Sequence, residues 1–95
     1  MQMLGKINFD IITDLSKLPQ KPATAMAKIE NPELTGGRYK ALMYIGDQPV
    51  NGTNYWFIAE QTLSTRESDE HLVLIAVNEF DFKFEVVKPS IIKIL

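Results

Sequence analysis

Few residues of this chain have the types and spacing that metal binding or acid–base catalysis requires. Its single histidine, His71, follows Asp69 and Glu70, and all three side chains are potential metal ligands. Neighbouring residues of a strand point to opposite faces, however, so the tripeptide is predicted to be a solvated cluster at a turn. Two further carboxylates, Glu60 and Glu67, form no pair with these residues that would favour general acid–base catalysis.

Motifs for nucleophilic attack and phosphate binding are missing from the sequence as well. The 95 residues include no cysteine, which excludes a thiolate nucleophile, a disulfide framework and Cys-based metal sites. Gly36-Gly37-Arg38 is too short for a phosphate loop and follows no predicted strand. We therefore predict that the protein is not an enzyme and that it uses no cofactor and no metal.

Composition narrows the choice of partners. Ten Lys and Arg against 12 Asp and Glu give a formal net charge of −2, and the basic residues are scattered. This pattern lacks the basic footprint of a nucleic-acid binder or of a protein that binds anionic membranes. No signal peptide is visible, and no apolar run approaches the ~20 residues that span a bilayer. We expect a cytoplasmic protein that is one domain over residues 1–95.

The first quarter of the chain predicts a strand and then a short helix. Apolar and polar residues alternate over 6–12, which is typical of a strand. Pro22 suits the first turn of a helix, because its missing N–H costs nothing there. Ala25, Met26 and Ile29 would share one face of two to three turns, and Pro32 stops the helix or kinks it into an extra turn over 32–34.

The rest of the sequence predicts strands. Four segments are rich in β-branched and aromatic residues and are separated by connections of hairpin length: 38–46, 54–63, 70–80 and 84–94. This order indicates an antiparallel meander. The predicted fold class is α+β, with an N-terminal strand and one short helix packed on a four- to five-stranded antiparallel sheet.

The segment 70–80 is apolar on both of its faces, which is unusual for a strand with one solvated side. Leu72, Leu74 and Ala76 lie on one face, and Val73, Ile75 and Val77 lie on the other. One explanation is incidental apolar surface, which is common. The other is that a second copy of the chain covers the outer face, so that the protein is a homo-oligomer.

The strongest local signal is Asn51-Gly52 between two apolar and aromatic runs, which predicts a tight hairpin turn. Gly52 permits the positive φ that such a turn needs, and Asn51 tolerates the same conformation. A turn alone does not explain the neighbouring Gln48 and Val50, nor the polar and aromatic sequence 53–55. This hairpin is therefore a candidate contact site.

The residues of this hairpin resemble a known signature. Gln48-Pro49-Val50-Asn51-Gly52 is similar to the Gln-x-Val-x-Gly motif of the cystatins, and Thr53-Asn54-Tyr55 extends the similarity. Pro22-Ala23-Thr24 resembles an element of the stefin branch, whose members lack disulfides and signal peptides. The resemblance implies a cystatin-like fold over most of the chain.

The same resemblance implies inhibition of a papain-like cysteine protease. Cystatins occlude the active-site cleft reversibly and non-covalently with an N-terminal segment and two hairpins, and present no cleavable bond. Here these elements would be Leu4-Gly5, the hairpin at 48–52 and the hairpin at 80–83. The residues expected to contact the protease are Leu4, Gly5, Gln48, Pro49, Val50, Asn51, Gly52, Phe80 and Phe82.

Departures from the family pattern favour alternatives. The interval from Pro22 to Gln48 is shorter than in stefins by about two helical turns, Pro49 replaces a common valine, and 80–83 lacks the usual Pro-Gly or Pro-Trp. The chain could then be a non-inhibitory cystatin-fold protein that binds a partner or self-assembles. A strand-swapped dimer hinged at 48–52 is a third alternative. Alternating phenylalanines such as Phe80 and Phe82 also commonly face a core.

Overall fold

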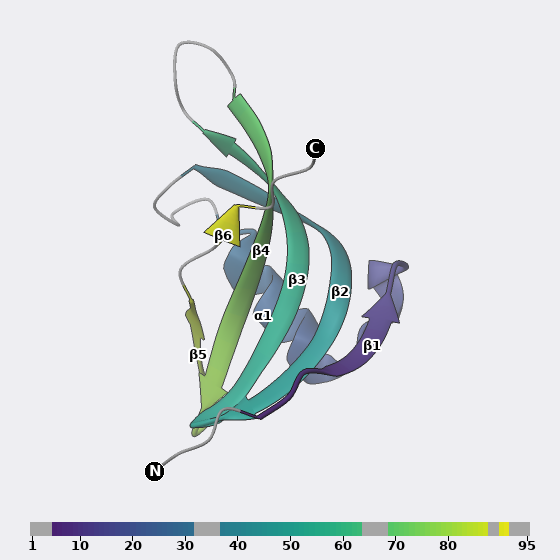
Figure 1. Cartoon of the computed structure of the whole chain (residues 1–95), viewed down its shortest axis with the longest axis vertical. Helices are drawn as coiled ribbons and strands as arrows, with labels where there is room; N and C mark the ends of the chain where they lie inside the picture. Colours follow the sequence, from purple (N-terminus) through teal and green to yellow (C-terminus); the bar gives the residue numbers. More distant parts are fainter. Residues whose placement is uncertain (1–4, 32–36, 64–68, 88–89, 92–95) are drawn as a thin grey trace.

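The structure is a computed structural model that describes residues 5–31, 37–63, 69–87 and 90–91. Its elements follow the chain in this order: β1 (Asn8–Ile12), a 3-10 helix η1 (Leu15–Lys17), α1 (Gln20–Ile29), β2 (Arg38–Val50), β3 (Gly52–Leu63), β4 (Asp69–Phe80), β5 (Lys83–Val86) and β6 (Ser90–Ile91). Figure 1 shows the strands as one curved sheet with α1 behind it.

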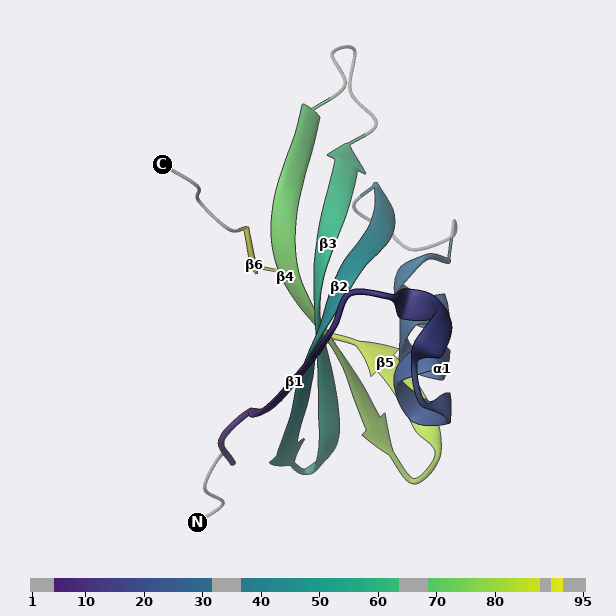
Figure 2. The same cartoon turned by 90° about the vertical axis from the view of Figure 1, so that its right-hand side faces the viewer.

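All strand pairs of the sheet are antiparallel. The spatial order is β1-β2-β3-β4-β5, and the short β6 pairs with β4 outside this path. Figure 2 shows that α1 lies against one side of the sheet only. The predicted α+β class and the antiparallel meander are therefore confirmed.

The core lies between α1 and the middle of the sheet. Ala25 and Ile29 of the helix have no exposed surface and pack in one cluster with residues of the long strands. The register places Tyr44 opposite Phe57, and Phe57 opposite Ile75, so these side chains form a row across three strands. The Tyr44 and Phe57 rings lie 5.3 Å apart in a tilted arrangement, which suits their quadrupoles.

The helix forms where the sequence predicts it. Pro22 sits in the first turn, and Ala25 and Ile29 are fully buried while Met26 packs partly against the core. The common face and the length of two to three turns are confirmed. The alternative of an extra turn over 32–34 lies outside the described residues.

Two predicted strand boundaries differ from the structure near the first hairpin. β2 continues to Val50 and β3 begins at Gly52, so the connection is much tighter than the predicted loop over 47–53. Polar residues pair across this end of the ladder, with Gln48 opposite Asn54. The ladder tolerates these residues because their side chains find hydrogen-bond partners within the protein. β1 also begins two residues later than predicted, at Asn8.

The prediction of one strand over 84–94 is wrong. β5 ends at Val86, and the N–H of Val87 donates to the carbonyl oxygen of Ala76 at 2.7 Å. β6 then makes its own pairing with β4, with Ile91 opposite Val73. The interval contains Pro89, which has no N–H for a ladder, and this signal outweighs the β-branched composition.

The two faces of β4 are both largely apolar, as the sequence indicates. Val73, Ile75 and Val77 are fully buried in the core with α1. On the other face Ala76 is also buried, whereas Leu74 is only partly covered by the described residues. The homo-oligomer stays a prediction. Within the described parts of the chain, no helix has the length and apolar character needed to cross a membrane.

Candidate binding edge

The first hairpin reverses the chain very tightly. The register pairs Pro49 with Thr53 and Val50 with Gly52, so only Asn51 lies between the last paired residues. Gly52 has φ +88°, a backbone conformation that favours glycine in tight turns. Asn51 does not share this conformation, because positive φ among the described non-glycine residues occurs only in the second hairpin. The expectation of an unusual dihedral at Asn51 is therefore wrong.

Gly52 is also required by a close approach between the two hairpins. A Cβ atom at this position would lie 2.2 Å from the carbonyl oxygen of Glu79 and 3.2 Å from the Cβ of Phe80. The backbone of the first turn therefore packs directly against the end of β4. On the solvent side, the Asn78 side-chain amide donates to the carbonyl oxygen of Asn51 at 3.2 Å. The turn of the first hairpin is therefore joined to the end of β4, next to the turn of the second hairpin.

The N-terminal segment is bound to the first hairpin. The N–H of Gly5 donates to the carbonyl oxygen of Pro49 at 2.9 Å, and the Gln48 side-chain amide donates to the carbonyl oxygen of Gly5 at 2.9 Å. The indole N–H of Trp56 donates to the Gln48 side-chain oxygen at 3.0 Å. Gln48 thus uses its side chain inside the protein, and it holds the N-terminal segment in place. Leu4 lies outside the described residues.

The second hairpin has an unusual turn. Phe80 pairs with Lys83, and the two central residues Asp81 and Phe82 have φ of 52° and 62°. Positive φ at both central positions is the type I′ turn, which favours Asn or Asp first and Gly second. Phe80 is 53% exposed and Phe82 is 81% exposed. The alternative in which these phenylalanines pack in the core is therefore wrong.

An ion pair connects α1 to the second hairpin. The Lys21 ammonium lies 2.6 Å from a Glu79 carboxylate oxygen and 5.5 Å from the centroid of the Phe82 ring. The hydrogen bond and the negative charge of Glu79 raise the pKa of Lys21. Glu79 is buried, with its side chain 10% exposed, so this contact also satisfies a carboxylate that has little access to water.

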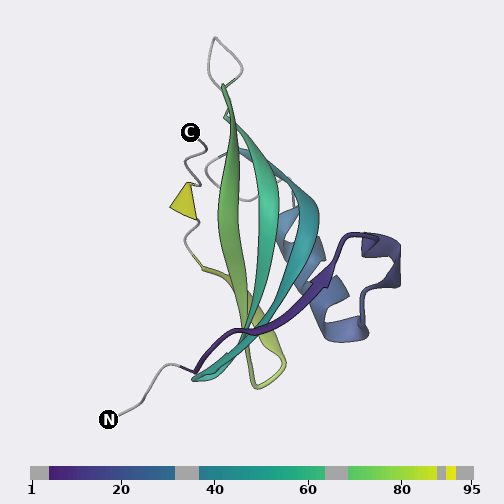
Figure 3. The same ribbon diagram turned by 45° about the vertical axis from the view of Figure 1, so that its right-hand side comes forward.

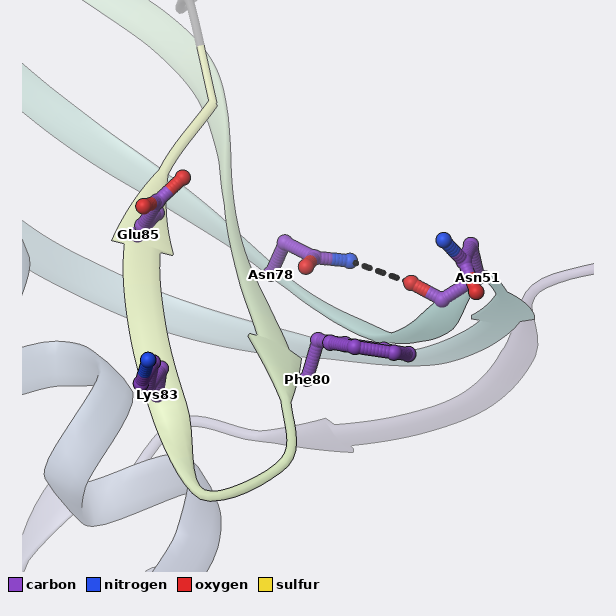
Figure 4. Close-up of a pocket in the computed structure, with 5 residues that line it drawn as sticks. All are labelled: Asn51, Asn78, Phe80, Lys83 and Glu85. Atoms are coloured by element: carbon purple, nitrogen blue, oxygen red, sulfur yellow. Dashed lines mark hydrogen bonds between the residues drawn. The ribbon is translucent and has the colours of Figure 1, made fainter.

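A shallow pocket of about 250 Å³ opens between the two hairpins (Figure 4). Its lining combines two amides, an aromatic ring and two opposite charges, from Asn51, Asn78, Phe80, Lys83 and Glu85. Figure 4 shows the Phe80 side chain extending from β4 toward the first turn. The Asn78 amide also donates to the Asn54 side-chain oxygen at 2.9 Å, so it ties β3 to β4 at the base of this pocket.

These segments lie side by side at one end of the sheet. In Figure 2 the chain near the N-terminus, the turn between β2 and β3, and the turn between β4 and β5 follow one another along the lower end of the molecule. Figure 3 shows the same end from an intermediate direction. We call the set of Gly5, Gln48–Gly52 and Phe80–Lys83 the binding edge. It brings together the described residues that the sequence singled out.

Other residues of this end were missed by reasoning from the sequence. Trp56 and Asn78 stabilise the edge through side-chain hydrogen bonds, and Lys21 and Glu79 form the ion pair. A hairpin centred on Asn51-Gly52 implies the proximity of Trp56 to Gln48. Lys21 and Glu79 are 58 residues apart, and no local pattern connects them.

The polar tripeptide Asp69-Glu70-His71 lies elsewhere, at the start of β4. His71 is on β4 opposite Gln61 of β3, far along the strand from the binding edge. Among the described residues, no group of three or more His, Asp or Glu side chains is arranged to hold a metal ion.

Comparisons of this chain with protein-family models, with curated proteins and with solved structures found no match.

Proposed function

We propose that this protein has a cystatin-like fold and inhibits a papain-like cysteine protease by inserting its binding edge into the active-site cleft. The observation that supports this most strongly is the assembly of the edge. Three segments that lie far apart in the sequence meet at one end of the sheet, and hydrogen bonds join the first two. A V-shaped cleft with its thiolate and histidine at the bottom accepts a wedge of this kind.

Each part of the edge has a distinct role in the proposed complex. Val50 and Asn51 lie at the turn of the first hairpin. Val50 has a stiff apolar side chain that can be buried in a narrow site of the protease. Gly5 continues the edge toward Leu4, whose side chain would fill an apolar pocket of the protease. The second hairpin supplies two exposed aromatic side chains, Phe80 and Phe82.

The internal bonds of the edge favour tight binding. Association loses free energy when side chains and loops become ordered at the interface. Here Gln48 already fixes the N-terminal segment, Pro49 has a fixed φ, and Asn78 supports the backbone of the first turn. The edge is therefore preorganised before it meets the protease. Three segments of this size are sufficient for an interface of roughly 1,600 Å².

Inhibition of papain by variants of the first turn tests this proposal. Val50→Glu places a charge at the turn without opposing its backbone conformation, and it is expected to weaken inhibition by at least about tenfold. Leu42→Glu is the control, because it also replaces an aliphatic side chain with glutamate, at an exposed position of β2 away from the edge. The proposal fails if Val50→Glu and Leu42→Glu inhibit papain equally well.

A second candidate function rests on the helix-free face of β4. Leu72 and Leu74 are only partly covered there, which favours a cystatin-fold protein that self-assembles or binds another partner instead of inhibiting a protease. Sedimentation at high concentration distinguishes the two. A monomer removes the support for self-assembly, whereas a dimer that dissociates in Leu74→Glu supports it.

A further inference from the structure

The two phenylalanines of the second hairpin have different surroundings. Phe80 lines the pocket beside Asn51, and its Cβ would lie 3.2 Å from a Cβ placed on Gly52. Phe82 lies in the turn itself, is 81% exposed, and has the Lys21 ammonium of α1 5.5 Å from its ring centroid. Phe80 thus packs beside the first hairpin, whereas the ring of Phe82 is available for contact with a partner.

Phe82 occupies a backbone position that is costly for its side chain. A bulky residue at φ +62° is a conformational outlier, and the second central position of this turn type favours glycine. Strained positions of this kind concentrate where side chains contact ligands. The strain therefore makes sense if the exposed ring of Phe82 has a binding role.

Lys21 is itself held in place beneath this ring. Its ammonium is bound by Glu79 of β4, and the Glu79 side chain is only 10% exposed. The long lysine side chain, which is half-exposed, therefore has a fixed endpoint. From that endpoint the ammonium lies 5.5 Å from the Phe82 ring centroid, within the range of a cation–π interaction.

We propose that Phe82 is the anchor by which the second hairpin contacts the protease, and that the Lys21–Glu79 ion pair positions its ring for that contact. The proposal rests on the protease-inhibitor function proposed above. It assigns Lys21 and Glu79 as positioning residues: they act through Phe82. Holding the ring in its bound orientation reduces the entropy that binding would otherwise lose.

A double-mutant cycle measured as papain inhibition tests this proposal. Phe82→Ala is expected to weaken binding by about tenfold or more, as for an interface hot spot. The pair variant Lys21→Met/Glu79→Gln removes the cation without leaving a buried unpaired carboxylate, and it is expected to weaken binding about two- to fivefold. Added to Phe82→Ala, the pair variant should have no further effect.

Three matched variants complete the design. Lys21→Arg keeps both the ion pair and the cation–π contact, and its affinity should stay within about twofold of the parent. Lys17→Met removes a lysine whose partner is the exposed Asp14, and it should leave inhibition unchanged. Phe80→Ala removes the other aromatic ring and should weaken binding less than Phe82→Ala does.

The outcomes separate this inference from the proposed function. If the parent protein does not inhibit papain or a second papain-like protease, the proposed function fails and the anchor assignment fails with it. If the parent inhibits but Phe82→Ala binds as tightly, or Phe80→Ala loses more, only the anchor assignment is overturned. If the effects of the pair variant and Phe82→Ala multiply, the positioning role is overturned.

The positioning contact also has a readout that needs no protease. Proton NMR of the parent should show the Lys21 side-chain methylene signals shifted upfield by the Phe82 ring current. The shift should be lost in Phe82→Leu and kept in Phe80→Leu. Unshifted Lys21 signals in the parent would overturn the positioning role, because a purely structural ion pair predicts no such dependence on Phe82.

Discussion

Gln48 is the residue whose observed role differs most from what its motif suggests. Its side chain has both functional groups bonded within the protein, to the carbonyl oxygen of Gly5 and to the indole of Trp56. A residue that a signature marks for protease binding thus stabilises the shape of the edge. Its contribution to inhibition would be indirect, through the position of the N-terminal segment.

Gln48→Met keeps the length of the side chain and removes both hydrogen bonds. We expect the free energy of unfolding to fall by about 1–2 kcal/mol, since two partly buried bonds are lost. Hydrogen exchange of the Gly5 amide should accelerate, because the carbonyl of the same residue is released. Gln20→Met, at the exposed start of α1, is the control. Unchanged Gly5 exchange would contradict the role given to Gln48.

Gly52 and Asn51 are adjacent but should respond oppositely to substitution. Gly52→Ala places a Cβ at φ +88° and 2.2 Å from a backbone oxygen, so stability should fall by roughly 2 kcal/mol or more. Asn51→Ala has no such conflict, and its effect should stay within about 0.5 kcal/mol. Urea unfolding of both variants measures the difference. Equal effects would mean that the turn has a different conformation.

We expect the Phe82 side chain to lower the stability of the fold while it strengthens papain inhibition. Glycine suits φ +62°, so Phe82→Gly should raise the free energy of unfolding by about 0.5–1 kcal/mol while it weakens papain inhibition. Asp81→Asn, a residue equally suited to its position, should leave the free energy of unfolding unchanged. Thermal unfolding and inhibition are measured on the same samples. A loss of stability in Phe82→Gly would show that the Phe82 side chain is not strained in the native turn.

At the scale of elements, the sequence predicts most of the frame, because its signals are local. Alternating apolar residues, Pro22 in a first turn and Asn51-Gly52 between two strands each reflect neighbouring residues. The features that the sequence did not predict depend on contacts between distant residues or on local signals that conflict. The segment 84–94 has a β-branched composition that favours one strand, but β5 ends at Val86. The Lys21–Glu79 pair joins residues 58 positions apart, so no local pattern predicts it.

The packing of the long strands against α1 makes the free energy of unfolding depend on pH in the alkaline range. Burial raises the pKa of Tyr44 and also raises the pKa of Tyr55, so both phenols keep their protons in the folded protein. The unfolded chain releases these protons near pH 10. The folded state therefore binds more protons above about pH 10, and the free energy of unfolding must fall as the pH rises further.

Urea unfolding at a series of pH values tests this dependence. The parent should be equally stable across pH 7 to about pH 9 as far as these tyrosines are concerned, and it should lose stability beyond about pH 10. Tyr44→Phe removes the phenol with the larger shift, so its loss above pH 10 should be smaller. An identical alkaline loss in Tyr44→Phe would contradict the effect of burial on Tyr44.

In the molecule as a whole, internal hydrogen bonds and an ion pair concentrate at one end of the sheet. The short helix covers the middle of the sheet and leaves both hairpins free beyond it, while its first turn reaches the second hairpin through Lys21 (Figure 2). Hydrogen bonds and the ion pair converge on this end. Two turns and the N-terminal segment therefore lie together at one end of the fold.

Occlusion of the protease cleft can be tested by titrating active-site-calibrated papain with the parent protein and recovering the chain for mass spectrometry. Occlusion by the binding edge predicts reversible inhibition that is complete at one inhibitor per enzyme, with the chain recovered intact. Full papain activity at micromolar protein, or a chain cleaved within 48–52, would contradict the claim.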